Sequence, residues 1–236
     1  MLLDICFSPA LYSYYGQPED IVIITDIYRA TTTMCMALNN GASAIIPVAD
    51  IEEAEQYKKE GFLVGAERNT KKCSFADFGN SPFEYTTGQV AGKEIVFTTT
   101  NGTRALHATK DYRELFIGAF SNIDVLVERC IELDGRIVII CAGWNNKVNS
   151  EDMLFAGAFA ERLCAKTDAK IESDAGRIAL DLWNVAKRDL TAYIKNTDHY
   201  SRLMANGLER DAAFCLEQNT VPLVPYYDKD GKIKVG

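Results

Sequence analysis

The stretch Ile21-Val22-Ile23-Ile24-Thr25-Asp26-Ile27-Tyr28-Arg29-Ala30-Thr31-Thr32-Thr33 decides the fold of this chain. Its first part is a run of β-branched residues, which is typical of a strand buried on both faces. Its second part is a polar turn that leads into a helical pattern over about residues 31–40, which ends at Asn40-Gly41. A strand, a turn and a helix in this order predict a parallel sheet covered by helices.

The same pattern recurs at two further places in the sequence. An apolar run at 94–98 leads through a turn at 99–103 into a helix expected over about 103–110, followed by a strand at 115–118. A second run at 136–141 leads through 142–150 into a helix expected over about 151–165. These pseudo-repeated units predict a three-layer α/β/α fold with a largely parallel sheet.

The remaining segments complete the prediction. Strands are expected at 45–48 and 62–65, on either side of a helix over 51–60, and a long polar connection fills 66–94. A connection of that length is more often functional than not. Residues 172–218 are predicted to be helical, and the proline-containing tail after them to be extended. Without a recognisable linker, residues 1–236 are taken as a single α/β domain, with two intertwined lobes as the alternative.

Composition and charge exclude several classes of protein. The net charge of -8 argues against nucleic-acid or membrane-surface binding, which need a basic surface. Seven cysteines without a CxxC pair do not form a disulfide framework, so we expect a reducing, cytoplasmic compartment. The start of the chain lacks the basic region of a signal peptide, and no apolar run approaches the roughly 20 residues of a membrane span.

Polar residues gather where the predicted strands end. In parallel sheets, ligands bind at the carboxyl ends of the strands, so hydroxyls, amides and arginines there predict a site for a small, multiply charged anion. Thr31, Thr32 and Thr33 offer hydroxyls and free backbone N–H groups at a helix start, although plain helix capping is the alternative. A similar turn contains Asn101, Gly102, Thr103 and Arg104, where glycine allows close approach and arginine offers a fork of donors.

Asp26 has three candidate roles. Its carboxylate can bind Mg²⁺, which prefers oxygen ligands, or accept a phosphoryl group as a nucleophile. The haloacid-dehalogenase pattern would need a second aspartate two residues later, where this chain has Tyr28. The third possibility is that Asp26 only caps the following helix and pairs with Arg29. We favour the metal ligand.

Two other groups of acidic residues are candidates. Glu67, Arg68 and Asn69 follow a short strand at the start of the long connection, although a Glu-Arg pair is often only a solvated ion pair. Glu151 and Asp152 follow Ser150 at the start of the third helix, where they can act as capping acids or reach a shared metal.

Other catalytic patterns are absent or incomplete. Cys141 resembles the nucleophile of a cysteine phosphatase, but the C-x5-R pattern fails because Lys147 stands in place of arginine. His107 and His199 have no Cys, His or Asp partners at ligand spacing, which disfavours a zinc site. Dinucleotide-binding and P-loop motifs are missing.

Several of these segments, taken in order, resemble the 2-phosphosulfolactate phosphatase family. The matching stretches are Thr25–Thr33, Gly65–Asn69, Phe78–Tyr85, Thr98–Arg104, Cys141–Gly143 and Ser150–Asp152. The resemblance implies a three-layer α/β fold and magnesium-dependent hydrolysis of 2-phospho-3-sulfolactate to sulfolactate and phosphate, an early step of coenzyme M biosynthesis. The chain departs from the family near the last Val-Pro, where Gln218-Asn219-Thr220 supplies no acidic residue.

The combined hypothesis gives each residue a role. Catalysis is assigned to Asp26, Arg29 and Arg68, and Mg²⁺ binding to Asp26, Glu67, Glu151 and Asp152. The residues expected to bind the substrate are Thr31, Thr32, Thr33, Asn69, Asn101, Gly102, Thr103 and Arg104. The phosphoryl charge is expected to be neutralised by Arg29, Arg68 and the backbone amides near Thr32 and Gly102. The carboxylate or sulfonate of the substrate is expected near Asn69, Asn101 and Arg104. The alternatives are a non-catalytic protein that binds or senses a small anion, and an isomerase or lyase acting on a phosphorylated acid. The predicted helices over 172–218 are a candidate surface for a homo-oligomer.

Overall fold

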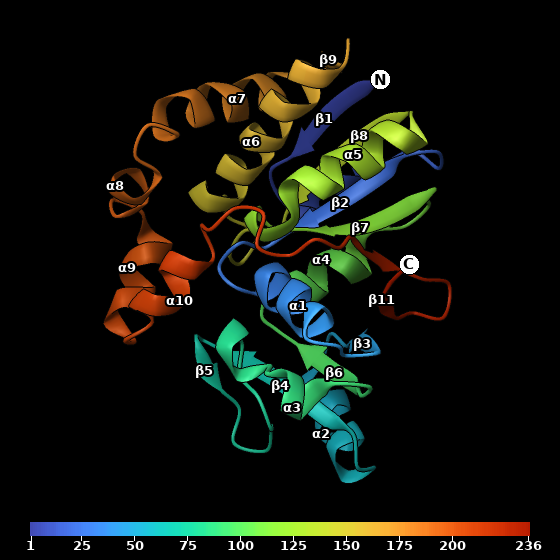
Figure 1. The fold of residues 1–236 in the computed structure, drawn as a ribbon, viewed down its shortest axis with the longest axis vertical. Coiled ribbons are helices and arrows are strands. Elements are labelled where there is room, and N and C mark those ends of the chain that lie inside the picture. The colour runs from blue at the N-terminus through green and yellow to red at the C-terminus, as the bar shows by residue number, and fades with distance from the viewer.

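The computed structural model describes residues 1–236 and confirms the α/β fold (Figure 1). An 11-stranded sheet has the order β5-β4-β6-β3-β11-β10-β7-β2-β8-β1-β9. The strands are β1 (Leu2–Cys6), β2 (Ile21–Thr25), β3 (Ala44–Pro47), β4 (Leu63–Arg68), β5 (Lys71–Lys72), β6 (Glu94–Thr98), β7 (Glu114–Gly118), β8 (Arg136–Cys141), β9 (Lys170–Ile171), β10 (Pro225–Tyr227) and β11 (Ile233–Val235).

The sheet consists of two parallel groups joined by a hairpin. Strands β4, β6 and β3 form one group, and β7, β2, β8, β1 and β9 form the other. The hairpin β10–β11 pairs antiparallel with β7 on one side and with β3 on the other. Three antiparallel pairings separate the two groups, namely β3 with β11, β11 with β10, and β10 with β7. Because this number is odd, the two parallel groups run in opposite directions. The prediction of a largely parallel sheet is therefore confirmed. Its antiparallel parts are the hairpin made by the end of the chain and the edge strand β5, which pairs antiparallel with β4.

Helices cover both faces of the sheet. They are α1 (Ala30–Asn39), α2 (Ile51–Lys59), α3 (Thr87–Val90), α4 (Gly102–Ala108), α5 (Ile123–Leu133), α6 (Ser150–Lys166), α7 (Asp174–Ala186), α8 (Leu190–Ile194), α9 (Asp198–Ala205) and α10 (Glu209–Phe214). Short 3-10 helices lie at Pro9–Tyr14, Pro82–Glu84 and Phe120–Asn122. Helices α5, α6 and α7 pack near β1 and β8, whereas α1 and α4 lie below β7 in the middle of the view in Figure 1. None of the helices is long and apolar enough to cross a membrane.

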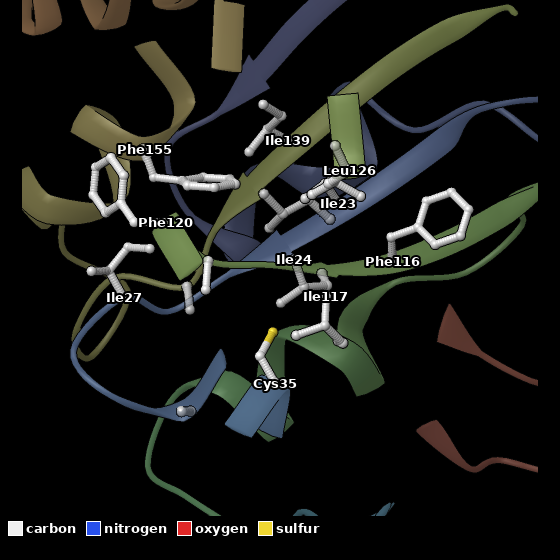
Figure 2. Packing of buried hydrophobic residues seen from close by; sticks show 14 of the residues in the cluster. Ile23, Ile24, Ile27, Cys35, Phe116, Ile117, Phe120, Leu126, Ile139 and Phe155 are labelled. Carbon is white, nitrogen blue, oxygen red and sulfur yellow. The ribbon is translucent and has the colours of Figure 1, made fainter. Parts of the chain in front are cut away.

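The core lies where the central strands meet these two helix layers. Every residue of β2 is buried, as the β-branched run predicts. Successive side chains of a strand point to opposite faces, so Ile23 faces Phe155 of α6 while Ile24 lies toward Cys35 of α1 (Figure 2). Gly118 of β7 lies under Phe155, because a Cβ there would stand 2.8 Å from the phenyl ring. Large side chains on both faces thus fix the central strands, and with them the turns that follow.

The predicted elements are found close to their predicted positions, and several further elements were not predicted. Strand β4 continues to Arg68 instead of ending at residue 65, and the predicted helical region 172–218 is divided into α7, α8, α9 and α10. Strand β1, helix α5 and the hairpin β10–β11 were not predicted. The hairpin strands are short, and their pairing depends on distant strands, so local patterns do not reveal them.

Candidate active site

A cavity of about 140 Å³ lies at the carboxyl ends of strands from both parallel groups. Its wall includes Asp26 after β2, Glu67 at the end of β4, Thr99 after β6 and Trp144 after β8. Although the two groups run in opposite directions, their carboxyl ends therefore meet at one site. This agrees with the expectation that a ligand binds at the strand ends.

Asp26 is the most buried acid in this cavity wall. Its side chain is 5% exposed, and no side chain pairs with its carboxylate, since Arg29 turns to another partner. Burial raises its pKa to about 7, helped by the neighbouring Glu67 and Glu151 and opposed by His199. Gly102 adjoins the same carboxylate: a Cβ on Gly102 would lie 3.1 Å from Oδ2 of Asp26 and 2.9 Å from the Cβ of Ala30. The predicted close approach of glycine is thus toward Asp26.

Two further acids stand near Asp26. Glu67 is 7% exposed and accepts a hydrogen bond from the backbone N–H of Thr70. Glu151, at the start of α6, is 1% exposed, and its Oε1 lies 2.5 Å from Nδ1 of His199. The other oxygen of Glu151, Oε2, is buried without a hydrogen-bond partner. A buried carboxylate oxygen in this state indicates a missing positive or hydrogen-bonding partner.

These acids can bind a hard divalent cation such as Mg²⁺, which takes its remaining ligands from water and substrate. No three His, Cys, Asp or Glu side chains converge closely enough to form a ready-made metal cage. Mg²⁺ rarely uses such cages; it is usually held by one or two carboxylates, several waters and the phosphate of a substrate. Asp26 and Glu67 line the cavity, and Glu151, whose Oε2 has no partner, lines an adjoining cavity of about 520 Å³. The donor set therefore fits Mg²⁺, and its binding stays a prediction.

Asp152 has a different environment from Glu151. It is 1% exposed, and each of its carboxylate oxygens accepts a backbone hydrogen bond at 2.9 Å, from Ile27 and from Gly143. The pKa of Asp152 is nevertheless raised well above its usual range, because burial and the charge of Glu151 outweigh these two hydrogen bonds. Asp152 does not line the cavity; it ties the turn after β2 to the turn after β8.

Arg29 reaches the cavity wall from the start of α1. Its guanidinium is 4% exposed and forms an ion pair of 2.9 Å with Asp211 of α10, and it also donates to the carbonyl of Thr70. Asp211 accepts a second hydrogen bond, of 3.0 Å, from the hydroxyl of Ser81. The alternative in which Arg29 pairs with Asp26 is therefore not found; Arg29 pairs with Asp211 and holds α10 against the site.

The hydroxyls of the threonine-rich turns are mostly used by the protein itself. Those of Thr31, Thr32 and Thr33 donate to the carbonyls of Asp26, Ile27 and Asn80. The hydroxyl of Thr103 donates in the same way to the carbonyl of Thr99. None of these four side chains lines the cavity. They shape the turns that carry Asp26 and Thr99, because short hydroxyl side chains readily bond to nearby backbone.

Two predicted arginines also lie away from the cavity. Arg104 is exposed, and neither Arg104 nor Arg68 is among the residues of the cavity wall. The guanidinium of Arg68 donates to the carbonyl of Glu67 at 2.7 Å, to the carbonyl of Ala49 at 3.2 Å and to the hydroxyl of Thr98 at 2.9 Å. Arg68 therefore braces the ends of β4 and β6. Asn69 and Asn101, in contrast, do line the cavity, as predicted.

The position of Arg68 leads to a testable expectation. Arg68→Ala should lower the free energy of unfolding by about 1–3 kcal/mol, since a charged donor group with three acceptors is lost. It should affect turnover less than any change to Asp26. Thermal melting together with steady-state kinetics checks this. A strong rise in KM at unchanged stability would instead return Arg68 to a role in substrate binding.

The cavity wall contains an unusual number of buried polar atoms without partners. Tyr28 Oη, Asn80 Oδ1, Thr99 Oγ1 and Thr100 Oγ1 all lack a hydrogen-bond partner, and all four residues line the cavity. Buried polar groups are otherwise nearly always paired. Their concentration here indicates that this wall is built to receive a polar ligand.

The last part of the chain supplies site residues that the sequence analysis missed. His199, Arg202, Leu203 and Asn206 line the cavity from α9 and the residue that follows it. The ring of His199 stands edge-on to that of Tyr28, with centroids 5.6 Å apart. Ligand spacing within one short segment does not reveal His199, because its partner Glu151 lies on a different helix. The helical spacing of the four residues was the available signal.

Cys141 is not a candidate nucleophile in the structure. Its side chain is completely buried at the end of β8, and burial raises the pKa of its thiol well above the usual value. A reactive cysteine needs the opposite, a lowered pKa and access to the ligand. All seven cysteines are free thiols in the structure.

Comparison with known proteins identifies the relatives of this chain. The family model described as 2-phosphosulpholactate phosphatase matches residues 6–230. A probable 2-phosphosulfolactate phosphatase of Clostridium novyi (strain NT) is 34% identical over 230 residues, which cover 96% of this chain and 97% of the relative. A protein of the same name from Thermotoga petrophila is 37% identical over 203 residues, which cover 86% and 87% of the two chains. The match extends over the strand-end turns that build the cavity and over the α9 and α10 segment, so this chain belongs to the 2-phosphosulfolactate phosphatase family of phosphoric monoester hydrolases.

Proposed function

We propose that this protein is a magnesium-dependent phosphatase that hydrolyses 2-phospho-3-sulfolactate to sulfolactate and phosphate, the step that the family resemblance assigns to coenzyme M biosynthesis. One observation carries the proposal. A cavity at converging strand ends combines buried carboxylates that lack a positive partner with a buried arginine and several unpaired polar atoms. This combination suits a metal-bound phosphate, whose hydrolysis depends mainly on positioning and charge stabilisation.

Two kinds of group in the cavity wall would bind the phosphoryl group: a positive charge and neutral hydrogen-bond donors. Arg29, held in place by Asp211, presents a fixed positive charge that attracts the phosphoryl group and offsets its negative charge. Tyr28 Oη and the hydroxyls of Thr99 and Thr100 are free to donate to its oxygens. Because these donors are fixed by the surrounding structure, little reorganisation is needed when charge develops in the transition state.

Asp26 is the residue best suited to accept or donate a proton during catalysis. Its pKa of about 7 in the absence of ligands means that both protonation states are populated near neutral pH. General acid–base catalysis is most effective when the pKa of the catalytic group lies near the working pH. We propose that Asp26 either orients and deprotonates the attacking water or, with Glu67, helps to hold the metal ion.

We assign the magnesium ion to the carboxylates of Glu67 and Glu151, which Asp26 joins in the second of its two proposed roles. Bound there, Mg²⁺ would polarise a phosphoryl oxygen and neutralise charge in the transition state. Glu151 is oriented by His199, which occupies one of its oxygens and leaves the other free. The hydrogen bonds of Asp152 to two turns suggest that it supports this arrangement without binding the ion.

The proposal is tested by phosphate release from 2-phosphosulfolactate and from a panel of phosphorylated 2-hydroxy acids, each with Mg²⁺ and with EDTA. We expect 2-phosphosulfolactate to be the best substrate, and EDTA to reduce the rate by about 100-fold or more, since metal stabilisation of such transition states is worth several kcal/mol. Activity should return when Mg²⁺ is restored.

Two other results would contradict the proposal in different ways. Binding of sulfolactate without phosphate release from any compound would indicate the non-catalytic anion-binding protein. Consumption of a phosphorylated acid without free phosphate would indicate an isomerase or lyase. Both are followed by calorimetric titration and by chromatography of the products.

A further inference from the structure

One face of helix α9 (Asp198–Ala205) forms a wall of the cavity. The lining residues His199, Arg202, Leu203 and Asn206 follow a spacing of three, four and seven residues from the first, which places them on one side of a helix. Leu203 is completely buried and His199 nearly so, which fixes the rotation of this helix against the site. The side chain of Arg202 is thereby directed to the cavity.

Arg202 is the one arginine of the cavity wall that has no acidic partner. Arg29 is paired with Asp211, whereas Arg202 forms no ion pair. Its guanidinium carbon instead stands 4.0 Å from the centre of the Trp144 ring. Stacking on an aromatic ring fixes the plane of a guanidinium while leaving its N–H donors free for a ligand.

Arg202 lies at the boundary between two cavities of the site. Arg202 and Trp144 line both the inner cavity and a wider adjoining cavity of about 520 Å³, so they stand where the two meet. Asp26 and Glu67 line only the inner cavity. The site therefore has two regions. The inner one contains Asp26, Glu67 and Arg29, and the outer one is lined by Glu151, Asp198 and Lys147. The unpaired, stacked Arg202 lies between them.

We propose that Arg202, backed by Trp144, binds the sulfonate of the substrate and so determines specificity. This inference rests on the proposed function, in which the phosphoryl group occupies the inner region beside Asp26 and Arg29. A sulfonate carries three oxygens that a guanidinium fork can bind with two parallel hydrogen bonds, as it does phosphate and carboxylate. The sulfonate is also the bulkiest charged group after the phosphate, and the wider region beside Arg202 has room for it.

The test compares two substrates and two arginines. Arg202→Gln removes the charge at nearly constant size, and Arg202→Lys keeps the charge but loses the fork and the stacking. The control is Arg210→Gln, because Arg210 also stacks on an aromatic ring, 3.7 Å from the centre of Phe83, but lines neither cavity. Each variant is assayed with 2-phosphosulfolactate and with 2-phospholactate, which has the phosphate and the carboxylate but no sulfonate.

We expect Arg202→Gln to raise KM for 2-phosphosulfolactate by about 10- to 100-fold, the usual effect of losing hydrogen bonds to a charged group. Arg202→Lys should have an intermediate effect. KM for 2-phospholactate should change by less than about 3-fold in both variants, and Arg210→Gln should leave both substrates unaffected. All variants should keep the thermal melting temperature of the parent protein, since Arg202 is partly exposed and forms no ion pair.

Two outcomes would overturn the inference. An equal rise of KM for both substrates would show that Arg202 does not recognise the sulfonate, and a change no larger than that of Arg210→Gln would show that it does not contact the substrate. Calorimetric binding of sulfolactate and of lactate to the same variants gives a measurement that needs no turnover. It separates a failure of this inference from a failure of the proposed function, which would appear as absence of phosphate release by the parent protein.

Discussion

Asp26→Asn is expected to reduce phosphate release by about 1,000-fold or more, which lies within the range for removal of a group that handles a proton or holds a metal. Asparagine keeps the size and most of the packing of Asp26, which is 5% exposed, but it can neither carry the charge nor accept a proton. The measurement is the single-turnover rate with saturating Mg²⁺, which separates chemistry from binding. Asp181→Asn is a suitable control, because Asp181 is exposed on α7 and forms no ion pair.

The same substitution should stabilise the metal-free protein, and this effect should depend on pH. The pKa of Asp26 is raised from 3.8 to about 7 in the folded protein, so between these values the folded state holds a proton that the unfolded state has lost. As the pH rises through this window, the cost of keeping Asp26 buried progressively lowers the free energy of unfolding, by a few kcal/mol at most. Above pH 7 the whole penalty is present.

Thermal melting in EDTA checks this second expectation. At pH 8, Asp26→Asn should melt several degrees above the parent protein, since about 1 kcal/mol corresponds to roughly 2–4 °C in a chain of this size. At pH 4 the two proteins should melt at nearly the same temperature. A variant with near-normal turnover, or with a melting difference that does not change with pH, would contradict the assignment of Asp26 as a buried, functional acid.

The parts of the site that the sequence predicted are those that follow directly from a strand. The run Ile21–Ile24 predicts a buried strand, and the residue just after such a strand must lie at its carboxyl end. Asp26, Glu67 and Asn101 are predicted in this way, and all three line the cavity. For these residues, the position along the chain already determines the position in the site.

The direction of a side chain at a strand end was harder to predict. Thr31, Thr32 and Thr33 lie where a ligand-binding turn was expected, but their hydroxyls donate to backbone carbonyls. A hydroxyl that binds a ligand and one that stabilises the turn have the same local sequence pattern, because both occur at the start of a helix. Only the geometry of the turn distinguishes them.

The contribution of the last quarter of the chain could not be predicted, because it depends on contacts between distant residues. Arg29 and Asp211 are 182 positions apart, and Glu151 and His199 are 48 positions apart. The pattern of residues 172–218 predicts helices, but a helical pattern does not say which strand ends the helix will cover. Consequently, Arg202 and Asp211 became visible as site residues only in the structure.

Asp211→Ala is expected to lower the free energy of unfolding by about 3–5 kcal/mol, because it leaves the charge of Arg29 buried without its acidic partner. The hydroxyl of Ser81 loses its acceptor as well, and Arg29 keeps only the carbonyl of Thr70, at 3.3 Å. This should lower the melting temperature by about 10 °C. We also expect kcat/KM to fall by about 100-fold, because a displacement of a charged group by about 1 Å can have this effect.

A double-mutant cycle separates this specific role from general damage to the fold. In an Arg29→Gln background the charge of Arg29 is absent, so Asp211→Ala should cost much less stability than it does in the parent protein. Asp211→Asn, which keeps an acceptor for Arg29, should lie between the parent and the alanine variant in both stability and kcat/KM. If Asp211→Ala destabilises the two backgrounds equally, the Arg29–Asp211 pair is not what holds α10 to the site. Helix α10 would then depend on its apolar contacts, such as the packing of Phe214 against Phe83, whose ring centroids are 4.9 Å apart.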